Sequence, residues 1–577
     1  MSVRREDTLP VWRLRAVVVL LLLLLGLLVW RLLSLQVLEA ERGYEFLQGQ
    51  GDARTIRTEI IPAHRGQIVD RNGEPLAIST PVVSIWANPS ETSADRTGWR
   101  ELAKRLDLSV DSLEQKMAHR GKRFVYLRRH LPPAEAEAVL ALKVAGVYGQ
   151  REYRRFYPAG DVTAHLLGFT NIDDRGQEGM ELAYDDWLSG QPGSKRVMKD
   201  LSGKIIREID AGKAARPGRD LMLSIDLRLQ YLAYRELRTQ LQEMGAAAGS
   251  VVMLDSHTGE VLAMANHPSF NPNNRTRLNP ASMRNRAMID LIEPGSTMKP
   301  LTVVAALESG KYTPDTPVDA SPGWIRVDRK TLKDPVNYGP ITVTKVITKS
   351  SQVGTTRIAL SLDHKAIWDV FRRFGLGASP DTGFPGESYG LLPNRRRWSD
   401  IERVNFAFGY GLSVTPLQLA RAYGVFAAGG RIYPVTLIKR DQPAKGEQVI
   451  AAGVAHELVD MLMTVTGPEG TAKRARIPSY TVAGKTGTVH KVGARGYEED
   501  RYRSIFAGFA PATAPRIVTV VVVDDPSKGR YFGGEVAAPV FARVVGGAMR
   551  MMNVAPDANS PAAVAQSTAK PVQKGPV

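Results

Sequence analysis

Ser296 and Lys299 are the residues whose types and spacing first suggest chemistry in this sequence. Proline is tolerated in the first turn of a helix but not in its interior, so Pro294 and Pro300 predict a helix that begins near Ser296 and continues to a cap at Gly310. Residues three apart lie on one helix face, and a serine hydroxyl beside a lysine amine is a nucleophile next to a base. Taken alone, the pair also fits a capping serine with an exposed lysine.

Two further motifs follow Ser296 in the same region of the chain. The first is Ser350-Ser351-Gln352, and the second is Lys485-Thr486-Gly487-Thr488, within a segment that has strand character. A glycine in a strand often marks a close approach by another backbone, so Gly487 would admit a substrate backbone. Three short motifs of serine, lysine and threonine therefore fall within one stretch of the chain.

Other kinds of catalytic or ligand-binding site do not fit the spacing of these residues. A phosphate-binding loop ending at Gly484-Lys485-Thr486 would need a glycine at position 479, where Ser479 stands. A hydrolase nucleophile elbow would need glycine at Pro294 and Met298. The chain has no cysteine, which excludes thiolate chemistry, and its nine histidines show no close metal-ligand spacing. We expect no metal and no cofactor.

The composition of the 577 residues indicates two or three folded domains with a net charge of +17. The basic residues are scattered rather than gathered into a stripe with interleaved aromatic residues, as a nucleic-acid site would show. An enzyme near an anionic membrane face or an anionic wall polymer fits the charge equally well. Charge alone does not choose between these classes.

The segment from Leu14 to Leu38 is long and apolar enough to cross a membrane, with basic residues before it. A cleaved signal peptide is the rival interpretation, but no small-residue cleavage site follows the apolar run promptly. We favour an uncleaved transmembrane anchor at 14–38. The arginines ahead of it predict a cytoplasmic N-terminus at 1–13 and an extracytoplasmic remainder.

Beyond the anchor, the hydrophobic patterns change near residue 220. Residues 39–220 combine short strand and helix patterns, including helical periodicity over 99–117 and 133–144, without a catalytic cluster. From 221 to 553 we expect an α+β domain, because strand hairpins at 250–264 and 504–523 enclose mostly helical patterns. Helices are predicted over 227–244 and 539–552. The composition of 554–577 predicts a disordered tail.

The three motifs together resemble the signature of the penicillin-binding proteins and serine β-lactamases. The anchor, the segment 65–73 (Arg-Gly-x-Ile-x-Asp-Arg-Asn-Gly) and the segment 176–181 (Gly-x-x-Gly-x-Glu) resemble a class B penicillin-binding protein. Segments 154–158 and 408–416 are most similar to the division type, penicillin-binding protein 3. The resemblance implies a transpeptidase domain with an antiparallel sheet and helices, after an elongated pedestal domain at 39–220 that is similar to a dimerisation domain.

The resemblance also implies an activity and its partners. Members of this family cross-link peptidoglycan stem peptides through a serine acyl-enzyme and are acylated by β-lactams. A donor and an acceptor stem peptide, the inner membrane and divisome proteins with a septal glycosyltransferase are the implied partners, and nucleic acid is not. The implied location is the inner membrane, with one span and a periplasmic catalytic domain.

Site roles follow from the same resemblance. Ser296 would be the nucleophile, Lys299 its base and Ser350 a proton relay. Lys485 would lie near Lys299, where its charge favours the neutral form of that amine. Three groups would bind substrate or line its site. The neighbours of Lys485 are Thr486, Gly487 and Thr488, and the residue at the end of the second motif is Gln352. The third group is three aromatic residues that could instead pack in the core, Tyr502, Tyr531 and Phe532.

One residue departs from the family pattern. The second motif ordinarily ends in asparagine, whereas this chain has Gln352. The extra methylene displaces the amide, and a displacement of roughly 1 Å can cost about 100-fold in rate. We expect the substrate or β-lactam preference of this protein to differ from that of a typical division enzyme.

Three alternative functions use the same pocket. A D,D-carboxypeptidase or a β-lactamase would form the same acyl-serine and release it to water, but the sequence offers no clear deacylating glutamate. A non-catalytic divisome scaffold or penicillin sensor would keep the pocket for binding alone.

Overall fold

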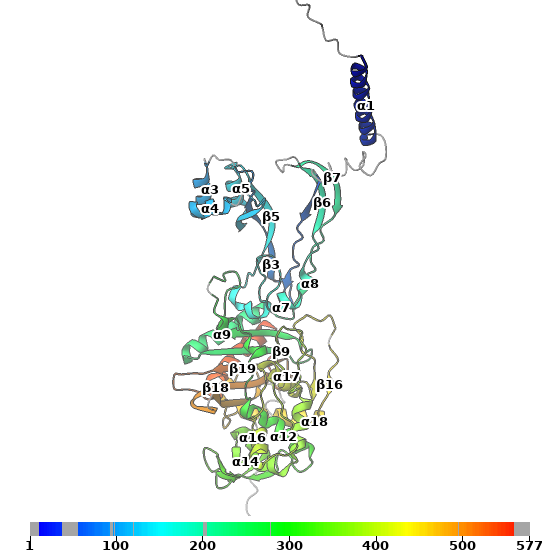
Figure 1. Ribbon diagram of the computed structural model, residues 1–577. Coiled ribbons are helices and arrows are strands. Elements are labelled where there is room, and N and C mark those ends of the chain that lie inside the picture. Colours follow the sequence, from blue (N-terminus) through cyan, green and yellow to red (C-terminus); the bar gives the residue numbers. More distant parts are fainter. Residues whose placement is uncertain are drawn as a thin grey trace, which may run out of the picture. The chain divides into compact units, whose positions relative to one another are not determined.

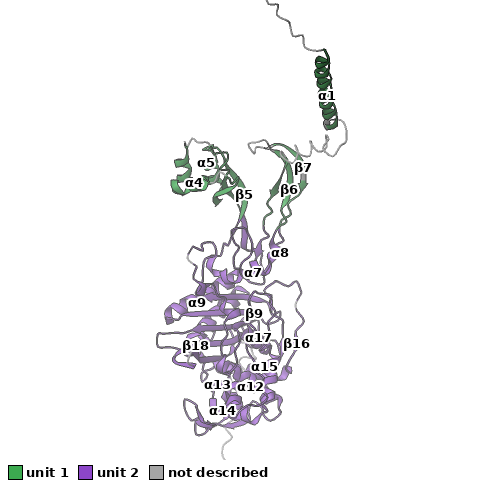
Figure 2. Cartoon of the chain, viewed as in Figure 1, with its two compact units in different colours: residues 1–64, 81–153, 190–217 green, residues 65–80, 154–189, 218–577 purple. Residues whose placement is uncertain are grey.

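The computed structural model describes residues 11–36, 56–92, 96, 98–118, 121–199, 205–276, 278–442, 444–493 and 496–558. These residues divide into two units, the first of which includes the N-terminal helix (Figures 1 and 2). Unit 1 contains residues up to 64, 81–153 and 190–217, and unit 2 contains 65–80, 154–189 and the chain from 218. The chain therefore crosses between the units several times before residue 218.

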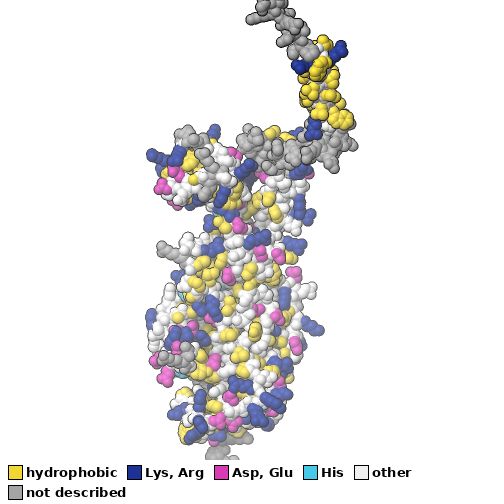
Figure 3. Space-filling model, viewed as in Figure 1, with side chains coloured by type: hydrophobic (Ala, Val, Ile, Leu, Met, Phe, Trp, Pro, Cys, Tyr) yellow, Lys and Arg dark blue, Asp and Glu magenta, His cyan; other side chains and the backbone are white. Residues whose placement is uncertain are grey.

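Helix α1 (Val11–Gln36) contains the expected anchor, of which only residues 37 and 38 lie outside the described residues. Its segment Val11–Ser34 is 24 residues long and unburied, and by length and composition it could cross a membrane. At 1.5 Å per residue it measures about 36 Å, enough for a hydrocarbon layer of roughly 30 Å. Figure 3 shows its apolar side chains as a nearly unbroken column with basic side chains near both ends.

Unit 1 contains a three-stranded antiparallel sheet and a separate small α/β cluster. The sheet has the order β1-β6-β7, with β1 at Ile56–Ile61, β6 at Gly193–Lys199 and β7 at Ile205–Lys213. The cluster contains β4 (Val125–Leu131), the earlier part of β5 (Val147–Phe156), the later part of β3 (Pro75–Ala87), α3 (Trp99–Arg105), α4 (Val110–Met117) and α5 (Pro133–Leu140).

The helical periodicity over 99–117 proved to be two helices rather than one. Helix α3 ends before Asp107, which has the left-handed backbone angle φ 52°, and Ser109 then caps α4 by accepting a hydrogen bond from the Ser112 amide. A serine cap starts a new helix because its side chain satisfies an otherwise unpaired N–H group.

Unit 2 is built on a five-stranded antiparallel sheet with the order β10-β9-β19-β18-β17. Its strands are β9 (Ala248–Asp255), β10 (Val261–His267), β17 (Ala483–Gly493), β18 (Gly496–Ala510) and β19 (Ile517–Asp524). Strand β19 is almost wholly buried and rich in valine, as suits a strand covered on both faces. Both expected hairpins are present, and they pair in one sheet that joins the two ends of the domain.

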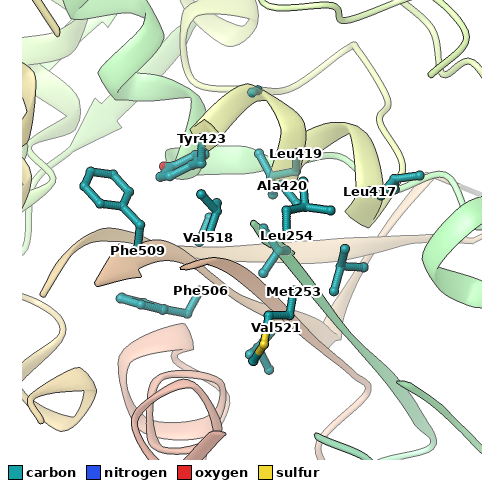
Figure 4. Packing of buried hydrophobic residues seen from close by; sticks show 14 of the residues in the cluster. Met253, Leu254, Leu417, Leu419, Ala420, Tyr423, Phe506, Phe509, Val518 and Val521 are labelled. Atoms are coloured by element: carbon teal, nitrogen blue, oxygen red, sulfur yellow. The ribbon is translucent and has the colours of Figure 1, made fainter. Parts of the chain in front are cut away.

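Helices cover both faces of this sheet. Helices α9 (Leu227–Met244) and α20 (Ala538–Met551) pack on one face, and α17 (Pro416–Ala427) packs on the other. In Figure 4, Leu254, Val518 and Phe509 point toward α17, while Met253, Val521 and Phe506 point away from it. The alternation follows the strand period of two and makes both faces part of one core. The predicted α+β class is confirmed.

The remaining helices and strands of unit 2 lie outside the five-stranded sheet and its three covering helices. Three hold the segments before residue 218: α6 (Ala164–Leu167), α7 (Gly179–Ala183) and α8 (Asp185–Leu188). Around the Ser296 segment lie α11 (Arg286–Ile289), α12 (Lys299–Glu308), α13 (Val343–Lys349), α14 (Gln352–Ser361), α15 (His364–Arg373), α16 (Asp400–Ala407), α18 (Ala452–Thr466) and α19 (Gly533–Val536). Two small antiparallel pairs precede α13: β11 (Pro317–Asp319) with β14 (Pro340–Thr342), and β12 (Trp324–Val327) with β13 (Lys330–Lys333).

The C-terminal residues up to 558 are tied to unit 2. The Asp557 carboxylate accepts hydrogen bonds from the Thr481 amide at 2.7 Å and the Thr513 hydroxyl at 2.7 Å, and Tyr480 donates to the Val554 carbonyl at 2.6 Å. The first residues of the expected tail are thus ordered, and 559–577 lie outside the described residues.

Candidate active site

Ser296 lies in a single 3₁₀ turn, Gly295–Met298, that leads directly into α12. The predicted helix start is confirmed, and Gly310, with φ 69°, follows the helix end. Two hydrogen bonds fix the turn: the Gly295 amide donates to the Gly409 carbonyl at 3.1 Å, and the buried Tyr423 hydroxyl donates to the Thr297 carbonyl at 2.8 Å. Ser296 itself is half-buried.

Lys299, the first residue of α12, is buried with its amine against the second motif. Its Nζ donates to the Ser350 carbonyl at 2.6 Å, to Ser350 Oγ at 3.2 Å and to the Ser351 carbonyl at 3.3 Å. The ring of Phe408 lies 5.3 Å from the same nitrogen. Two of the predicted motifs therefore meet at one amine.

The two motif lysines are both buried, and burial changes their protonation. Burial lowers the pKa of Lys299 to about 7, although the negative charge of Asp334 opposes this by raising it. Burial, and then the charge of Lys299, hold the pKa of Lys485 well below its usual value. An amine with a pKa near 7 is substantially neutral at physiological pH and can accept a proton.

Strand β17 brings the third motif next to the Ser296 turn. A Cβ atom added at Gly487 would lie 3.0 Å from both the Pro294 carbonyl oxygen and Thr297 Cγ2. Such a contact is tight, so the glycine permits the strand and the turn to touch. Strand β17 is also an edge strand, and an edge strand offers alternate backbone N–H and C=O groups to a further extended chain.

The side chains of the third motif differ in their surroundings. Lys485 is fully buried, and its Nζ donates to the Thr486 carbonyl at 3.2 Å. Thr486 shares a 2.9 Å hydroxyl contact with Thr471, and Thr488 Oγ1 accepts a hydrogen bond from the Gly533 amide at 3.0 Å. Thr488 is half-buried and opposes Ser504 on β18.

The three predicted aromatic residues form one stack beside Thr488, outside the core. Tyr502 and Tyr531 are stacked with ring centroids 4.0 Å apart, and Phe532 lies 4.5 Å from Tyr531 and is 54% exposed. The Tyr531 carbonyl accepts from the Ser504 hydroxyl, which opposes Thr488. Of the two interpretations of these residues, this position favours a wall of the site.

Gln352 is the first residue of α14 and is exposed. Its backbone N–H donates to Asp334 Oδ1 at 2.5 Å, but its side-chain amide makes no hydrogen bond to a described residue. The structure thus places the departing side chain at the surface beside the second motif.

Two residues at the site were missed from the sequence. Asp334 carries the negative charge that acts on Lys299, and Phe408 covers the Lys299 amine. Phe408 lies in a segment that the resemblance did single out, whereas Asp334 follows the short strand β13 with no motif around it. Only the folded chain shows that it contacts the second motif.

This arrangement can perform acyl transfer. A half-buried serine precedes a buried amine with a lowered pKa, a second serine contacts that amine, and an edge strand runs alongside. Nucleophile, base and polar backbone groups are the components that acyl transfer requires.

Comparison with known proteins decides the family. The family model for the penicillin binding protein transpeptidase domain matches residues 249–546, and the penicillin-binding protein dimerisation domain matches 60–223. A probable peptidoglycan D,D-transpeptidase, PbpC of Pseudomonas aeruginosa, is 44% identical over 528 residues, which cover 91% of this chain and 93% of that protein. The chain is a class B penicillin-binding protein.

Other members of this family show how far the similarity extends. The peptidoglycan D,D-transpeptidase FtsI of Escherichia coli is 43% identical over 555 residues, covering 95% of this class B protein and 93% of FtsI. Penicillin-binding protein 3 of Mycobacterium tuberculosis, solved in complex with aztreonam, is 28% identical with a TM-score of 0.67 over 86% of this chain and 98% of that chain. The transpeptidase domain of Burkholderia pseudomallei penicillin-binding protein 3 is 41% identical with a TM-score of 0.54, covering 58% of this chain and 97% of that domain.

Proposed function

We propose that this chain is a serine-type peptidoglycan D,D-transpeptidase that cross-links stem peptides during septal wall synthesis and is inhibited by β-lactams. The observation that carries the proposal is the buried amine of Lys299, which lies three residues after Ser296 and contacts Ser350. The similarity to peptidoglycan D,D-transpeptidases over more than nine-tenths of the chain supports it.

The reaction would begin at the carbonyl between the two terminal D-alanines of a donor stem. Ser296 Oγ attacks that carbon while its proton passes to the neutral Lys299 amine. Backbone N–H groups of Ser296 and Thr488 would stabilise the oxyanion, each contributing about 3 kcal/mol. Collapse breaks the peptide bond and leaves an acyl-serine, and the departing D-alanine amine receives a proton through Ser350.

The second half of the reaction transfers the acyl group to the amine of a neighbouring stem. Ser350 and Lys299 would accept the proton of that amine as it attacks the ester, and Ser296 recovers its hydroxyl. Lys485, Thr486 and Thr488 would bind the terminal carboxylate of the stem, and Gly487 would let its backbone approach. Gln352 and the stack of Tyr502, Tyr531 and Phe532 would contact the rest of the substrate.

For the cellular setting, we infer a single-pass protein of the inner membrane with a cytoplasmic N-terminus and a periplasmic catalytic domain. The apolar helix α1, with arginines ahead of its apolar run, supports this orientation. Divisome proteins, including a septal glycosyltransferase, are the proposed partners. The proposed domain boundaries remain 14–38 for the anchor, 39–220 for the pedestal and 221–553 for the transpeptidase domain.

The test compares the purified full-length chain with its Ser296→Ala variant. We expect the wild type to join donor and acceptor stem peptides with release of D-alanine, to be acylated rapidly by labelled penicillin and to release the label slowly. Ser296→Ala should do none of these. Rapid turnover of the antibiotic would indicate a β-lactamase, and unchanged septation by Ser296→Ala in cells depleted of the regular division enzyme would indicate a scaffold.

A further inference from the structure

Asp334 is a buried carboxylate that accepts hydrogen bonds from the second motif, which also contacts Lys299. It follows β13, is only 9% exposed, and is fixed by its own amide, which donates to the Gly323 carbonyl at 2.9 Å. Its Oδ2 accepts from the Ser351 hydroxyl at 2.5 Å, and its Oδ1 accepts from the Gln352 amide at 2.5 Å. Charge-assisted hydrogen bonds of this length are among the stronger ones in proteins.

These contacts fix the connection between α13 and α14. Ser351 is the N-cap of α14, and its Oγ accepts from the Gly354 amide at 2.9 Å while it donates to Asp334. The preceding residue, Ser350, has left-handed backbone angles, φ 55° and ψ 38°. A serine in this region stores strain of roughly 1 kcal/mol or more, so neighbouring contacts must hold it there.

The same strained turn places oxygen atoms of Ser350 and Ser351 within hydrogen-bond distance of the Lys299 amine. The Ser350 and Ser351 carbonyls lie 2.6 and 3.3 Å from Nζ, and Ser350 Oγ lies 3.2 Å away. Asp334 therefore reaches the amine through Ser351 at the Ser351 carbonyl, and through Ser351 and then Ser350 at the other two oxygen atoms. A shift of the carboxylate would move both serines relative to the base.

Charge gives Asp334 a second effect on the amine. Among the described groups that face Lys299, β17 contributes the like-signed Lys485 and the loop after β13 contributes Asp334. The connection between α13 and α14 contributes only neutral serines, and Phe408 contributes an uncharged ring. Asp334 is thus the carboxylate among these groups whose charge opposes, but does not cancel, the effect of burial on the pKa of Lys299.

We propose that Asp334 is a positioning residue for the acyl transfer: it holds the Ser350–Ser351 turn against Lys299 and supplies a negative charge near that base. The inference rests on the proposed function, because it assigns Asp334 a part in the reaction of Ser296. Asp334 itself touches neither Ser296 nor the reacting atoms in this arrangement; it acts through its neighbours.

The experiment measures the acylation rate of the full-length chain by labelled penicillin between about pH 5 and pH 9, the range in which the base titrates. Asp334→Asn removes the charge, so the midpoint of the pH–rate profile should fall by about one pH unit. Its maximal rate should fall by about 10-fold as the turn loosens. Ser351→Ala loosens the turn but keeps the charge, so its rate should fall with an unchanged midpoint.

Two controls make the result interpretable. Asp315→Asn, which changes an exposed carboxylate just before β11, should leave both the rate and the midpoint unchanged. Asp334→Glu keeps the charge but lengthens the side chain, so it should retain the midpoint and lose rate. Thermal unfolding of each variant identifies those that fold.

A wild-type midpoint in folded Asp334→Asn would overturn the proposal, whatever its maximal rate. If that variant does not fold, a wild-type maximal rate in Asp334→Glu would overturn it. Failure of the proposed function looks different: in that case the wild-type chain itself would not be acylated at Ser296.

Discussion

At the scale of single residues, the proposed chemistry depends on the buried amine of Lys299. Taking an ammonium group out of water disfavours its charge, and Lys299 is 1% exposed. The oxygen atoms of Ser350 and Ser351 satisfy its N–H groups without adding a formal charge. The result is an amine that is buried, hydrogen-bonded and titrates near neutral pH.

A pH profile tests this residue directly. Because a lysine accepts a proton only when it is neutral, the acylation rate should rise as the pH increases through about 7, the lowered pKa of Lys299. Lys299→Arg should abolish the reaction, since a guanidinium stays protonated. Stopped-flow acylation with labelled penicillin measures both, and a rate that is constant from pH 5 to about pH 9 would contradict the assignment.

At the scale of elements, the contact between β17 and the Ser296 turn assembles the site. Strand β17 pairs with β18 through the whole third motif, from Ala483–Phe509 to Thr488–Ser504. This pairing fixes which residues face the turn, and Gly487 removes the side chain that would keep them apart. The site is thus a junction between a sheet edge and a helix start.

Gly487→Ala should disturb that junction. The new Cβ would lie 3.0 Å from the Pro294 carbonyl, so the strand or the turn must shift, and we expect acylation about 10- to 100-fold slower. Gly424→Ala is the matched control, because nothing lies within 4 Å of its Cβ inside α17. It should keep the wild-type rate and gain up to about 1 kcal/mol of stability. Equal acylation rates in the two variants would show that the close contact at Gly487 does not matter for the reaction.

The sequence predicted most elements of unit 2 and the site residues that lie in motifs. Helix α9 follows from periodicity because it buries one regular face. The two hairpins follow from apolar segments on either side of a turn, although strands such as β9 and β19 are buried on both faces. Asp334 could not be predicted from the sequence. It follows the β12–β13 hairpin, and only the folded chain brings it into contact with Ser351 at the start of α14. The break between α3 and α4 was also missed, because Asp107 adopts a left-handed conformation that aspartate does not require.

At the scale of the whole molecule, buried ion pairs join distant segments within unit 2. Arg65 Nε contacts Glu181 at 2.7 Å, Arg155 Nε contacts the other oxygen of Glu181 at 2.6 Å, and Arg65 also contacts Asp185 at 2.6 Å. Glu181 is fully buried, and each arginine is nearly so. These contacts join segments 65–80 and 154–189 to each other within unit 2.

Glu181→Gln should destabilise unit 2 strongly. Removing one partner of a buried ion pair leaves uncompensated charges and typically costs roughly 3–5 kcal/mol. Glu178→Gln changes an exposed carboxylate of the same segment and should leave stability nearly unchanged. Denaturant unfolding of the two variants measures the difference, and equal free energies of unfolding would show that the network contributes no net stability.

The central claim is that Ser296 forms the acyl-enzyme, and peptide mapping tests it most directly. The full-length chain is treated with a penicillin, digested and analysed by mass spectrometry. We expect one penicilloyl adduct, on the peptide that contains Ser296, and none in Ser296→Ala. An adduct on Ser350 or another serine, or no adduct at all, would contradict it.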